Sequence, residues 1–466
     1  MRQINMYYLL GLFFISVSLV EAQNLNTAIA KDTNNLGYKL KNGGRFYFQA
    51  RSYFSSTFNK SELTDYYAWG IGAGVGYETP KLLRHFQLGI SSFSVFNLAS
   101  SDLTKADPLT NQVNRYEIGL FDIEQPENHQ DLNRLEELFI KAHLGKKSKI
   151  VLGRQIPQSP FINIQDGRMR PTLIEAAVLD LPEWENLSLH AEYIWKIAPR
   201  STMKWYNVGQ SIGLYPVGVG VNGEPSLYKN NTFSAGVGVL GINYRYKAWN
   251  IQLWDNYVDN LTNTGLLKIE WKSNYLTQNN WLLGIQLLRQ QTIGNGGNQD
   301  PAKAYAPKNN SANIVSARFG KQNPKFTWFL NATRIGDEGR YLMPREWGKE
   351  PFYTFIPRER NEGFGNLSAF TMNLIYKPAT NLKLEMNAGY FRLPDVQDFQ
   401  LNKYAMPAYT HINMGLNYQF KKYLKGLDLL LLVMRKDPTG NTYQNPRFIF
   451  NKVNMTHLNL VMNYQY

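Results

Sequence analysis

Two stretches of the sequence combine several arginines with prolines and aromatic residues. They are GRQIPQSPFINIQDGRMRP at 153–171 and PREWGKEPFYTFIPRERNEG at 344–363. A guanidinium group offers paired, planar N–H donors that match a carboxylate, and proline stiffens the backbone that carries it. Fixed positive charge of this kind suits the binding of small anions. The candidate solute-contacting residues in these stretches are Arg154, Asp166, Arg168, Arg170, Arg345, Arg358 and Arg360.

Other kinds of chemistry have less support in the sequence. None of the six histidines lies in a recognisable hydrolase motif, and no group of histidines and carboxylates has the spacing of a metal site. We therefore expect no cofactor and no enzymatic activity. The segment GNGGNQD at 294–300 is compatible with Ca²⁺ binding, although a plain flexible loop fits it better.

The segment GIGAGVG at 70–76 invites comparison with a phosphate-binding loop. Its glycines stand two residues apart, whereas a dinucleotide-binding turn needs a three-residue step before a helix. All four glycines share one face of a predicted strand. We expect small residues there to ease the curvature of an inner face.

The N-terminus predicts export from the cytoplasm. Arg2, a mostly apolar stretch from Met6 to Val20 and the small residue Ala22 are the three parts of a signal peptide, with cleavage expected after Ala22. A membrane anchor is the alternative, but a spanning helix needs about 20 apolar residues. The net charge of +14 suits anionic solutes or an anionic membrane surface, and export makes nucleic acid an unexpected partner.

The rest of the chain alternates apolar and polar residues with a period of two. In RFYFQARSYF, for example, Phe46 and Phe48 share one face, whereas Arg45 and Arg51 share the other. Helical periodicity is nearly absent. The pattern predicts eighteen strands, near 45–54, 66–77, 85–98, 137–144, 148–155, 172–180, 187–197, 233–246, 249–257, 264–272, 281–291, 312–320, 325–334, 367–376, 382–391, 410–420, 426–435 and 455–466.

The connections between these strands are alternately short and long. Short connections such as KA at 247–248 alternate with long ones such as 99–136 and 335–366. This alternation is typical of a transmembrane barrel with short periplasmic turns and long extracellular loops. Such a sheet must close into a ring, because lipid offers no hydrogen-bond partner to the backbone groups of an open edge. The sequence therefore predicts an all-β fold, a transmembrane antiparallel β-barrel of eighteen strands. Because so wide a barrel is otherwise open, we also expect inward-folded constriction loops.

The last strand ends on an aromatic residue. Leu460, Tyr464 and Tyr466 fall on one side of the two-residue period, whereas Asn459 and Asn463 fall on the other. The pattern resembles the signal that the barrel assembly machinery reads, with the two tyrosines as its aromatic residues. An ordinary edge strand in a soluble sandwich is the alternative.

The same alternation places charged side chains on the inside of the predicted barrel. Arg51 and Arg318 are the inward arginines that we expect to contact solute. Lys268 and Glu270 share this face, as do several other charged pairs, and we expect some of these pairs to neutralise each other across strands.

The stretch that leaves the predicted fifth strand resembles a known family. LGRQ at 152–155, SP at 159–160, DGRM at 166–169 and a following proline match the run by which OprD-type outer-membrane porins enter their constriction loop. Arg170 stands where an apolar residue is commoner in that family. The resemblance implies a monomeric barrel narrowed by its third and seventh loops, with an arginine ladder that guides carboxylate-bearing solutes.

These features together predict a porin of the bacterial outer membrane that conducts small anionic or zwitterionic solutes by passive diffusion. Its expected partners are those solutes, outer-membrane lipids and the barrel assembly machinery, and we expect a monomer. The expected organisation is a signal peptide at 1–22, a periplasmic segment at 23–44 and the barrel at 45–466. The alternatives are a barrel enzyme of the phospholipase kind and an adhesin that binds a partner through its long loops.

Overall fold

The computed structural model describes residues 38–39, 43–130, 132–165, 167–274 and 279–466. Within these residues, no helix is long and apolar enough to cross a membrane. The expected signal peptide at 1–22 and most of the expected periplasmic segment at 23–44 lie outside the described residues, so these two boundaries stay predictions.

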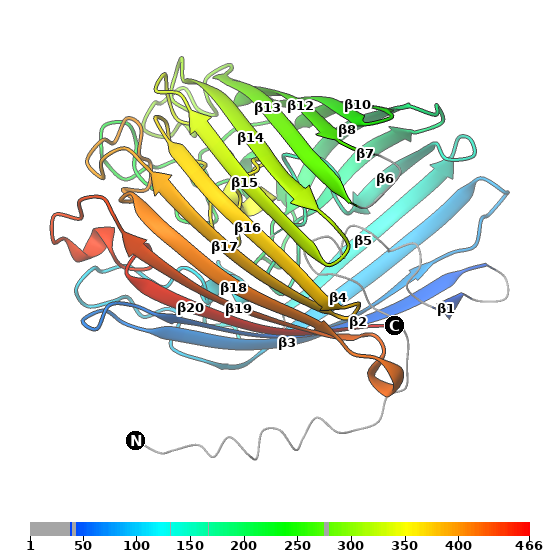
Figure 1. Ribbon diagram of the computed structural model, residues 1–466, viewed down its shortest axis with the longest axis horizontal. Coiled ribbons are helices and arrows are strands. Elements are labelled where there is room, and N and C mark those ends of the chain that lie inside the picture. The colour runs from blue at the N-terminus through cyan, green and yellow to red at the C-terminus, as the bar shows by residue number, and fades with distance from the viewer. Residues whose placement is uncertain (1–37, 40–42, 131, 166, 275–278) are drawn as a thin grey trace.

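The described strands form one closed antiparallel sheet (Figure 1). Of its twenty strands, β1 (Tyr38–Lys39) and β9 (Tyr206–Asn207) are two-residue additions beside β2 and β8. The other eighteen pair in chain order, and β20 pairs with β2, so the sheet has no free edge in the ring. Closure hydrogen-bonds every wall strand on both sides, as a spanning barrel requires.

The predicted β-barrel of eighteen strands is therefore confirmed, and each predicted strand overlaps an observed one. The strands of the ring are β2 (Arg45–Phe58), β3 (Tyr66–Glu78), β4 (Phe86–Ser100), β5 (Leu132–His143), β6 (Lys149–Gln155), β7 (Leu173–Leu181), β8 (Leu187–Ala198), β10 (Val237–Tyr246), β11 (Trp249–Val258), β12 (Thr262–Lys272), β13 (Asn280–Thr292), β14 (Ser311–Gln322), β15 (Phe326–Ile335), β16 (Ser368–Ala379), β17 (Leu382–Arg392), β18 (Tyr409–Gln419), β19 (Leu427–Pro438) and β20 (Met455–Gln465).

The last strand shows why the two faces of the wall differ. Asn459 and Asn463 are buried on the inside, whereas Leu460 is 39% exposed on the outside. Val461 breaks the alternation of the sequence and is only 1% exposed, because it packs on the inside against Phe121 and Met169 of two inward-folded loops. The exception in the sequence therefore marks a contact between the wall and the loops.

Aromatic side chains gather on the outside of the barrel near its short turns. Trp281 stacks on Phe319 with 5.4 Å between ring centroids, and Trp328 packs edge-on against both rings. Trp281 lies near the start of β13 (Asn280–Thr292), and Phe319 and Trp328 flank the turn at 323–325. Such a belt of exposed aromatic rings is typical of the boundary between a lipid bilayer and water.

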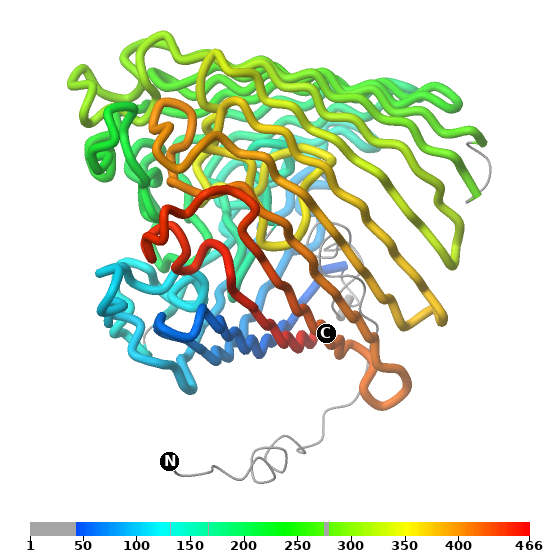
Figure 2. Tube along the Cα trace, turned by 60° about the vertical axis from the view of Figure 1, so that its left-hand side comes forward, coloured from blue at the N-terminus to red at the C-terminus, as the bar shows by residue number. Residues whose placement is uncertain are grey.

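The long loops lie at the opposite end of the barrel from the short turns (Figure 2). Three of them, 101–131, 156–172 and 336–367, send residues into the ring, where they contact wall strands. The yellow segment inside the wall in Figure 2 belongs to loop 336–367. The barrel is thus narrowed by its own loops, as the sequence predicted.

The glycines of β3 give one of these loops room to approach the wall. A Cβ atom on Gly72 or Gly74 would lie within 2.4 to 2.5 Å of the ring of Phe93, and one on Gly70 would lie 3.1 Å from the ring of Phe121. The four glycines do lie on the inner face, as expected. Because glycine has no side chain, aromatic rings can pack directly on the backbone at these positions. This packing restricts the choice of residue more strongly than the curvature of the strand alone.

Candidate functional site

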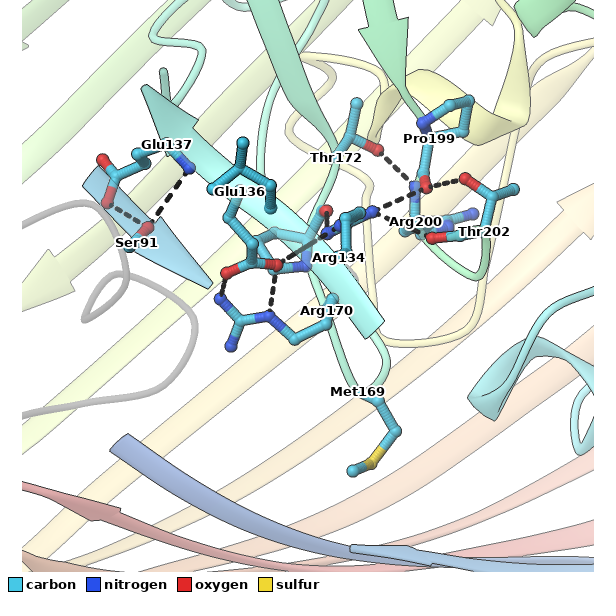
Figure 3. A network of polar contacts seen from close by, with 12 residues as sticks. Ser91, Arg134, Glu136, Glu137, Met169, Arg170, Thr172, Pro199, Arg200 and Thr202 are labelled. Atoms are coloured by element: carbon cyan, nitrogen blue, oxygen red, sulfur yellow. Dashed lines mark hydrogen bonds and ion pairs between the residues drawn. The ribbon is translucent and has the colours of Figure 1, made fainter. Parts of the chain in front are cut away.

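A buried cluster of three charges fastens loop 156–172 to the wall (Figure 3). The carboxylate of Glu136 accepts a hydrogen bond of 2.9 Å from Arg134 and one of 2.6 Å from Arg170, and Arg170 pairs with it through a second nitrogen as well. Arg134 also donates to the carbonyl oxygen of Pro171 at 2.8 Å, and the guanidinium of Arg170 lies 3.9 Å from the ring centre of Phe93. Arg170 therefore has a carboxylate partner within the protein.

A β-bulge in β5 places Glu136 of this cluster on the inner face of the barrel. Ser91 pairs with Glu137 while Ser92 pairs with Leu135, so Glu136 is an extra residue in β5. As a result both Glu136 and Glu137 face inward, and Glu137 accepts a hydrogen bond of 3.0 Å from Ser91 (Figure 3). The sequence pattern missed Glu136 because the predicted strand began at residue 137, and because simple alternation cannot place two neighbouring residues on one face.

Arg51 of β2, three strands along the ring from β5, binds the same loop. Its guanidinium donates to the carbonyl oxygens of Arg168 and Met169, and to the side chain of Asn463 on β20 at 2.6 Å. Arg51 faces inward, as its position in the strand predicts. Its donors are occupied by the backbone of loop 156–172, so it supports the loop that carries Arg168.

Loop 336–367 is fastened to the wall by Glu359. Its carboxylate lies 2.8 Å from the ammonium of Lys436 on β19 and 3.2 Å from the imidazole of His411 on β18. The same ammonium donates to the carbonyl oxygen of Arg358 at 3.2 Å. Burial opposes ionisation of Glu359, but the charge of Lys436 and the hydrogen bond from His411 outweigh it and hold the pKa below its ordinary value.

Arg358 adopts a backbone conformation that is unusual for a residue with a side chain. Its φ is +68°, in the left-handed region that favours glycine. Its guanidinium donates to Asn459 at 2.8 Å and to the hydroxyl of Tyr53, both on wall strands. Such a conformation costs on the order of 1 kcal/mol and persists only where surrounding contacts impose it, as they do here.

The inward loops meet at a narrow cavity of about 60 Å³. A single water needs at least about 10–15 Å³ of such space, so only a few water molecules fit at once. One of its linings is acidic, Glu359, which already pairs with Lys436. Its basic linings are Arg115, Arg168, Arg200, Arg345, Arg358, Arg360 and Lys436.

Aromatic rings complete the lining of this cavity and hold some of its arginines. The guanidinium of Arg345 lies 3.6 Å from the ring centre of Tyr404 and pairs with Glu362. Arg200 donates to the hydroxyl of Tyr215 at 3.1 Å. Burial acts to lower the pKa of Arg345, but Tyr404 and Glu362 raise it above its usual value. Arg345 is thus held in place and charged.

The structure places most of the residues that the sequence analysis proposed as solute contacts. Four of them, Arg168, Arg345, Arg358 and Arg360, line the cavity, and Asp166 lies outside the described residues. Arg154 pairs with Glu175 at 3.0 Å. These placements say where the side chains lie, and the roles in solute contact stay predictions.

Three further candidates lie away from the cavity. Arg318 faces the lumen and donates to Asn331 at 2.7 Å. The assembly-signal residues Tyr464 and Tyr466 lie at the end of the chain, where the backbone of Tyr466 exchanges two hydrogen bonds with Phe48. The terminal residue is therefore tied into the wall, while its recognition by the assembly machinery stays a prediction.

Three basic residues of the cavity were missed by the sequence analysis. Lys436 lies one residue beyond the predicted end of its strand, and Arg200 three residues beyond. Extending the alternation from Asp428 or Lys196 would have placed both on the inner face. Arg115 lies in the long loop 101–131, where no periodicity or motif points to it.

A second, wider cavity of about 800 Å³ lies at the short-turn end of the lumen. Its two acidic linings are already paired, Glu78 with Arg45 and Asp180 with Lys149. The pairs that the sequence expected to form across strands include some within one strand, such as Lys268 with Glu270 at 3.0 Å. The exposed basic residues of this cavity are Lys81, Lys146, Lys147 and Arg245.

A Thr–His–Glu contact inside the barrel does not have the geometry of a catalytic triad. The hydroxyl of Thr57 donates to Glu117 at 2.7 Å and lies 2.8 Å from Nδ1 of His457. All three side chains are at most 1% exposed, so no substrate reaches the hydroxyl. No group of three or more potential metal ligands occurs among the described residues.

Comparisons with known proteins agree on the fold. No family model and no curated protein sequence matches the chain. Among solved structures, OpdK of Pseudomonas aeruginosa with vanillate matches with a TM-score of 0.68 at 13% identity, over 91% of this chain and 98% of OpdK. OccK9 (OpdG) of the same species matches with a TM-score of 0.69 at 13% identity, over 92% of this chain and 99% of that one.

A third solved structure comes from another genus. OccAB3 of Acinetobacter baumannii matches with a TM-score of 0.68 at 15% identity, over 91% of this chain and 99% of that one. All of these are porins of the OprD/Occ kind. The resemblance first indicated by the run after the fifth strand therefore holds over nearly the whole barrel, and the chain has the fold of the OprD/Occ porins.

Proposed function

We propose that this protein is an outer-membrane porin for the passive diffusion of small solutes that carry a carboxylate group. The observation that carries the proposal is the cavity of about 60 Å³, where seven basic side chains from several loops and the wall face one acidic one. The closed barrel provides a path for the solute across the membrane. The cavity is the point on this path where anionic solutes are favoured over neutral and cationic ones.

The physics of the passage favours anions. Fixed positive charges with low-dielectric walls concentrate anions, and guanidinium groups bind carboxylates in a planar, paired geometry. Several weak contacts in series let a solute enter and also leave. The wider cavity at the short-turn end is also basic and favours anions in the same way. The crystallisation of OpdK with vanillate, an aromatic carboxylate, agrees with this class of solute.

The proposal places the barrel in the outer membrane of a Gram-negative bacterium as a monomer. The apolar outer face meets lipid, the aromatic belt marks the periplasmic boundary, and the long loops face outward. The barrel assembly machinery is the proposed partner during insertion. No contact in the described residues favours the phospholipase-like alternative, because the one hydroxyl–histidine–carboxylate contact is fully buried.

Planar-bilayer recording of the purified full-length protein tests the function. We expect ohmic channels whose reversal potential in a KCl gradient reports a preference for chloride over potassium. The absence of current would overturn the channel, and a preference for potassium would overturn the anion selectivity.

A further inference from the structure

Lys321 lies on the outer face of the wall between two tryptophans, near the short turn at 323–325. In the sheet it pairs with Trp281 of β13 on one side and with Trp328 of β15 on the other. Its ammonium lies 5.2 Å from the ring centre of Trp281. Three hydrogen-bond donors, the ammonium and the two indole N–H groups, therefore project from neighbouring strands at one level of the outer wall.

These three donors have no acceptor within hydrogen-bond distance in the described part of the chain, and no described carboxylate lies within ion-pair distance of Lys321. The sequence explains why, because β13, β14, β15 and β16 and the turns at 273–279 and 323–325 contain no aspartate or glutamate. Lys325 and Lys377 are exposed at the same end of these strands, where the backbone N–H of Lys377 donates to the carbonyl oxygen of Lys325 at 2.7 Å. The outer wall is thus basic here, with no acid of its own to neutralise it.

An open groove of about 750 Å³ lies on the outer wall beside these residues. Ala317 and Ala332 pair across β14 and β15 and form its floor. Their neighbours in the sheet and along the strands are large, exposed and apolar, and also line the groove: Ile285, Phe319, Leu330 and Phe370. Two small residues side by side therefore leave a hollow in a bulky apolar surface. Its volume is within the range of about 300–1,000 Å³ that is typical of ligand sites.

Aromatic contacts join the groove to the three donors. Trp281 stacks on Phe319 with 5.4 Å between ring centroids, and Trp328 packs edge-on against Phe319 at 5.6 Å. Ala317 lies four residues before Lys321 on β14, which is about 13 Å along the strand. That length is less than half of a hydrocarbon core about 30 Å thick. A head group at Lys321 and a hydrocarbon chain in the groove can therefore belong to one lipid molecule of one leaflet.

We propose that this part of the wall is a binding site for one anionic phospholipid of the periplasmic leaflet. The phosphate accepts hydrogen bonds from Lys321 and from the two indole N–H groups, and the exposed lysines of the short turns attract it. One acyl chain lies in the groove over the two alanines. The site rests on the proposed orientation of the barrel, with its short turns in the periplasm, and not on the selectivity for solutes.

Native mass spectrometry of the full-length protein released from detergent tests the site. The probes are phosphatidylglycerol and a diacylglycerol with the same acyl chains, which lacks the phosphate. We expect the unmodified protein to bind phosphatidylglycerol more tightly. K321M should raise the Kd for phosphatidylglycerol about tenfold, the effect of losing one charge-assisted hydrogen bond, and change the Kd for diacylglycerol by less than about threefold. A332F fills the groove without changing a charge and should weaken the binding of both lipids.

Two matched variants separate the site from general effects of charge and size. K146M removes an exposed lysine from the short turn between β5 and β6, which lines the wider cavity inside the ring. A142F enlarges an alanine on the outer face of β5, two residues from the exposed Ile140. We expect both variants to leave the two Kd values unchanged. Far-UV circular dichroism of each variant checks that the barrel is formed.

Each outcome bears on the site alone. Equal affinity of the unmodified protein for the two lipids, or an unchanged Kd for phosphatidylglycerol in K321M, would overturn the head-group site. An equal loss in K146M would assign the effect to diffuse charge and overturn it as well, and unchanged binding by A332F would remove the chain from the groove. Because the measurement involves no ion flow, an absence of current in planar bilayers would overturn the channel and leave this site standing.

Discussion

The carboxylate of Glu359 lies 2.8 Å from the ammonium of Lys436, and this contact joins the inward loop 336–367 to the wall strand β19. The two residues are 77 positions apart in the sequence, and both are nearly fully buried. Glu359 is also the one carboxylate among the described residues that line the cavity. It therefore holds the loop in place and also offsets part of the positive charge of the cavity.

Replacing Glu359 by glutamine should release the loop. Breaking a buried ion pair from one side costs about 3–5 kcal/mol, since Lys436 is left without a counter-charge. We expect E359Q channels to fluctuate between conductance levels and to pass larger neutral sugars in liposome swelling. D437N removes the exposed acid that directly follows Lys436 in the sequence and serves as the control. Steady channels with only a stronger chloride preference would show that Glu359 acts through charge alone.

The cluster of Arg134, Glu136 and Arg170 should matter for stability more than for selectivity. E136Q leaves two buried guanidinium groups without their carboxylate, so we expect a loss of about 3–5 kcal/mol in the free energy of unfolding. R170M should cost less and leave the chloride preference unchanged. Denaturant unfolding in detergent measures both. E137Q is the control, because the hydrogen bonds of Glu137 come from Tyr47 and Ser91 and not from an arginine.

Arg168 should discriminate between charged and neutral solutes. It lines the cavity on the loop that Arg51 and the Arg134 cluster hold in place. We expect R168A to lower the flux of a sugar acid about tenfold while the flux of the matching neutral sugar changes little, as measured by liposome swelling. Equal losses for the two solutes would mean that Arg168 supports the loop instead. R334A, at an exposed arginine on β15, is the control.

The docking of loop 101–131 should weaken as pH rises. Burial raises the pKa of Glu117 to about 7 from its ordinary value of 4.5, so the docked loop binds a proton more tightly than the free loop does. The stabilisation is complete below pH 4.5 and is lost as pH rises through 7, a change on the order of 3 kcal/mol. Hydrogen exchange of the loop should be faster at pH 8 than at pH 5.

Two variants isolate this effect of pH. In E117Q the side chain no longer titrates, and the difference in hydrogen exchange between pH 5 and pH 8, corrected for the intrinsic rate, should disappear. D102N removes an exposed acid of the same loop whose pKa is already lowered by hydrogen bonds from Thr104, so it should leave the difference in place. A pH effect that survives E117Q would assign the titration to another group.

Tyr466 should be needed for assembly more than for the stability of the finished barrel. Y466A removes one exposed ring and keeps the backbone hydrogen bonds to Phe48, so we expect little change in unfolding in detergent. In cells we expect the amount of membrane-inserted protein to fall several-fold, with Y466F close to normal. Y423A, at an exposed tyrosine in a short turn, is the control. Normal insertion of Y466A would remove the residue from the assembly signal.

The wall of the barrel could be predicted from the sequence, because each strand repeats the same two-residue alternation. The prediction failed where that alternation is interrupted. The bulge at Glu136 brought a second acid to the inner face, and the strands that continue to Ala198 and Pro438 brought Arg200 and Lys436 to the cavity. Loop residues such as Arg115 have no periodicity, so only the folded positions of the loops reveal them.

The cavity draws its lining from residues as distant in the sequence as Arg115 and Lys436, and the pairing of β20 with β2 joins the two ends of the sheet that carry them. Contacts between such distant residues form late, because much of the chain must already be ordered. We therefore expect the cavity to form late in the folding of a newly made molecule. A barrel that stopped before the loops were in place would let solutes pass without selection. Insertion into the membrane and the pairing of β20 with β2 are therefore best coupled in one step.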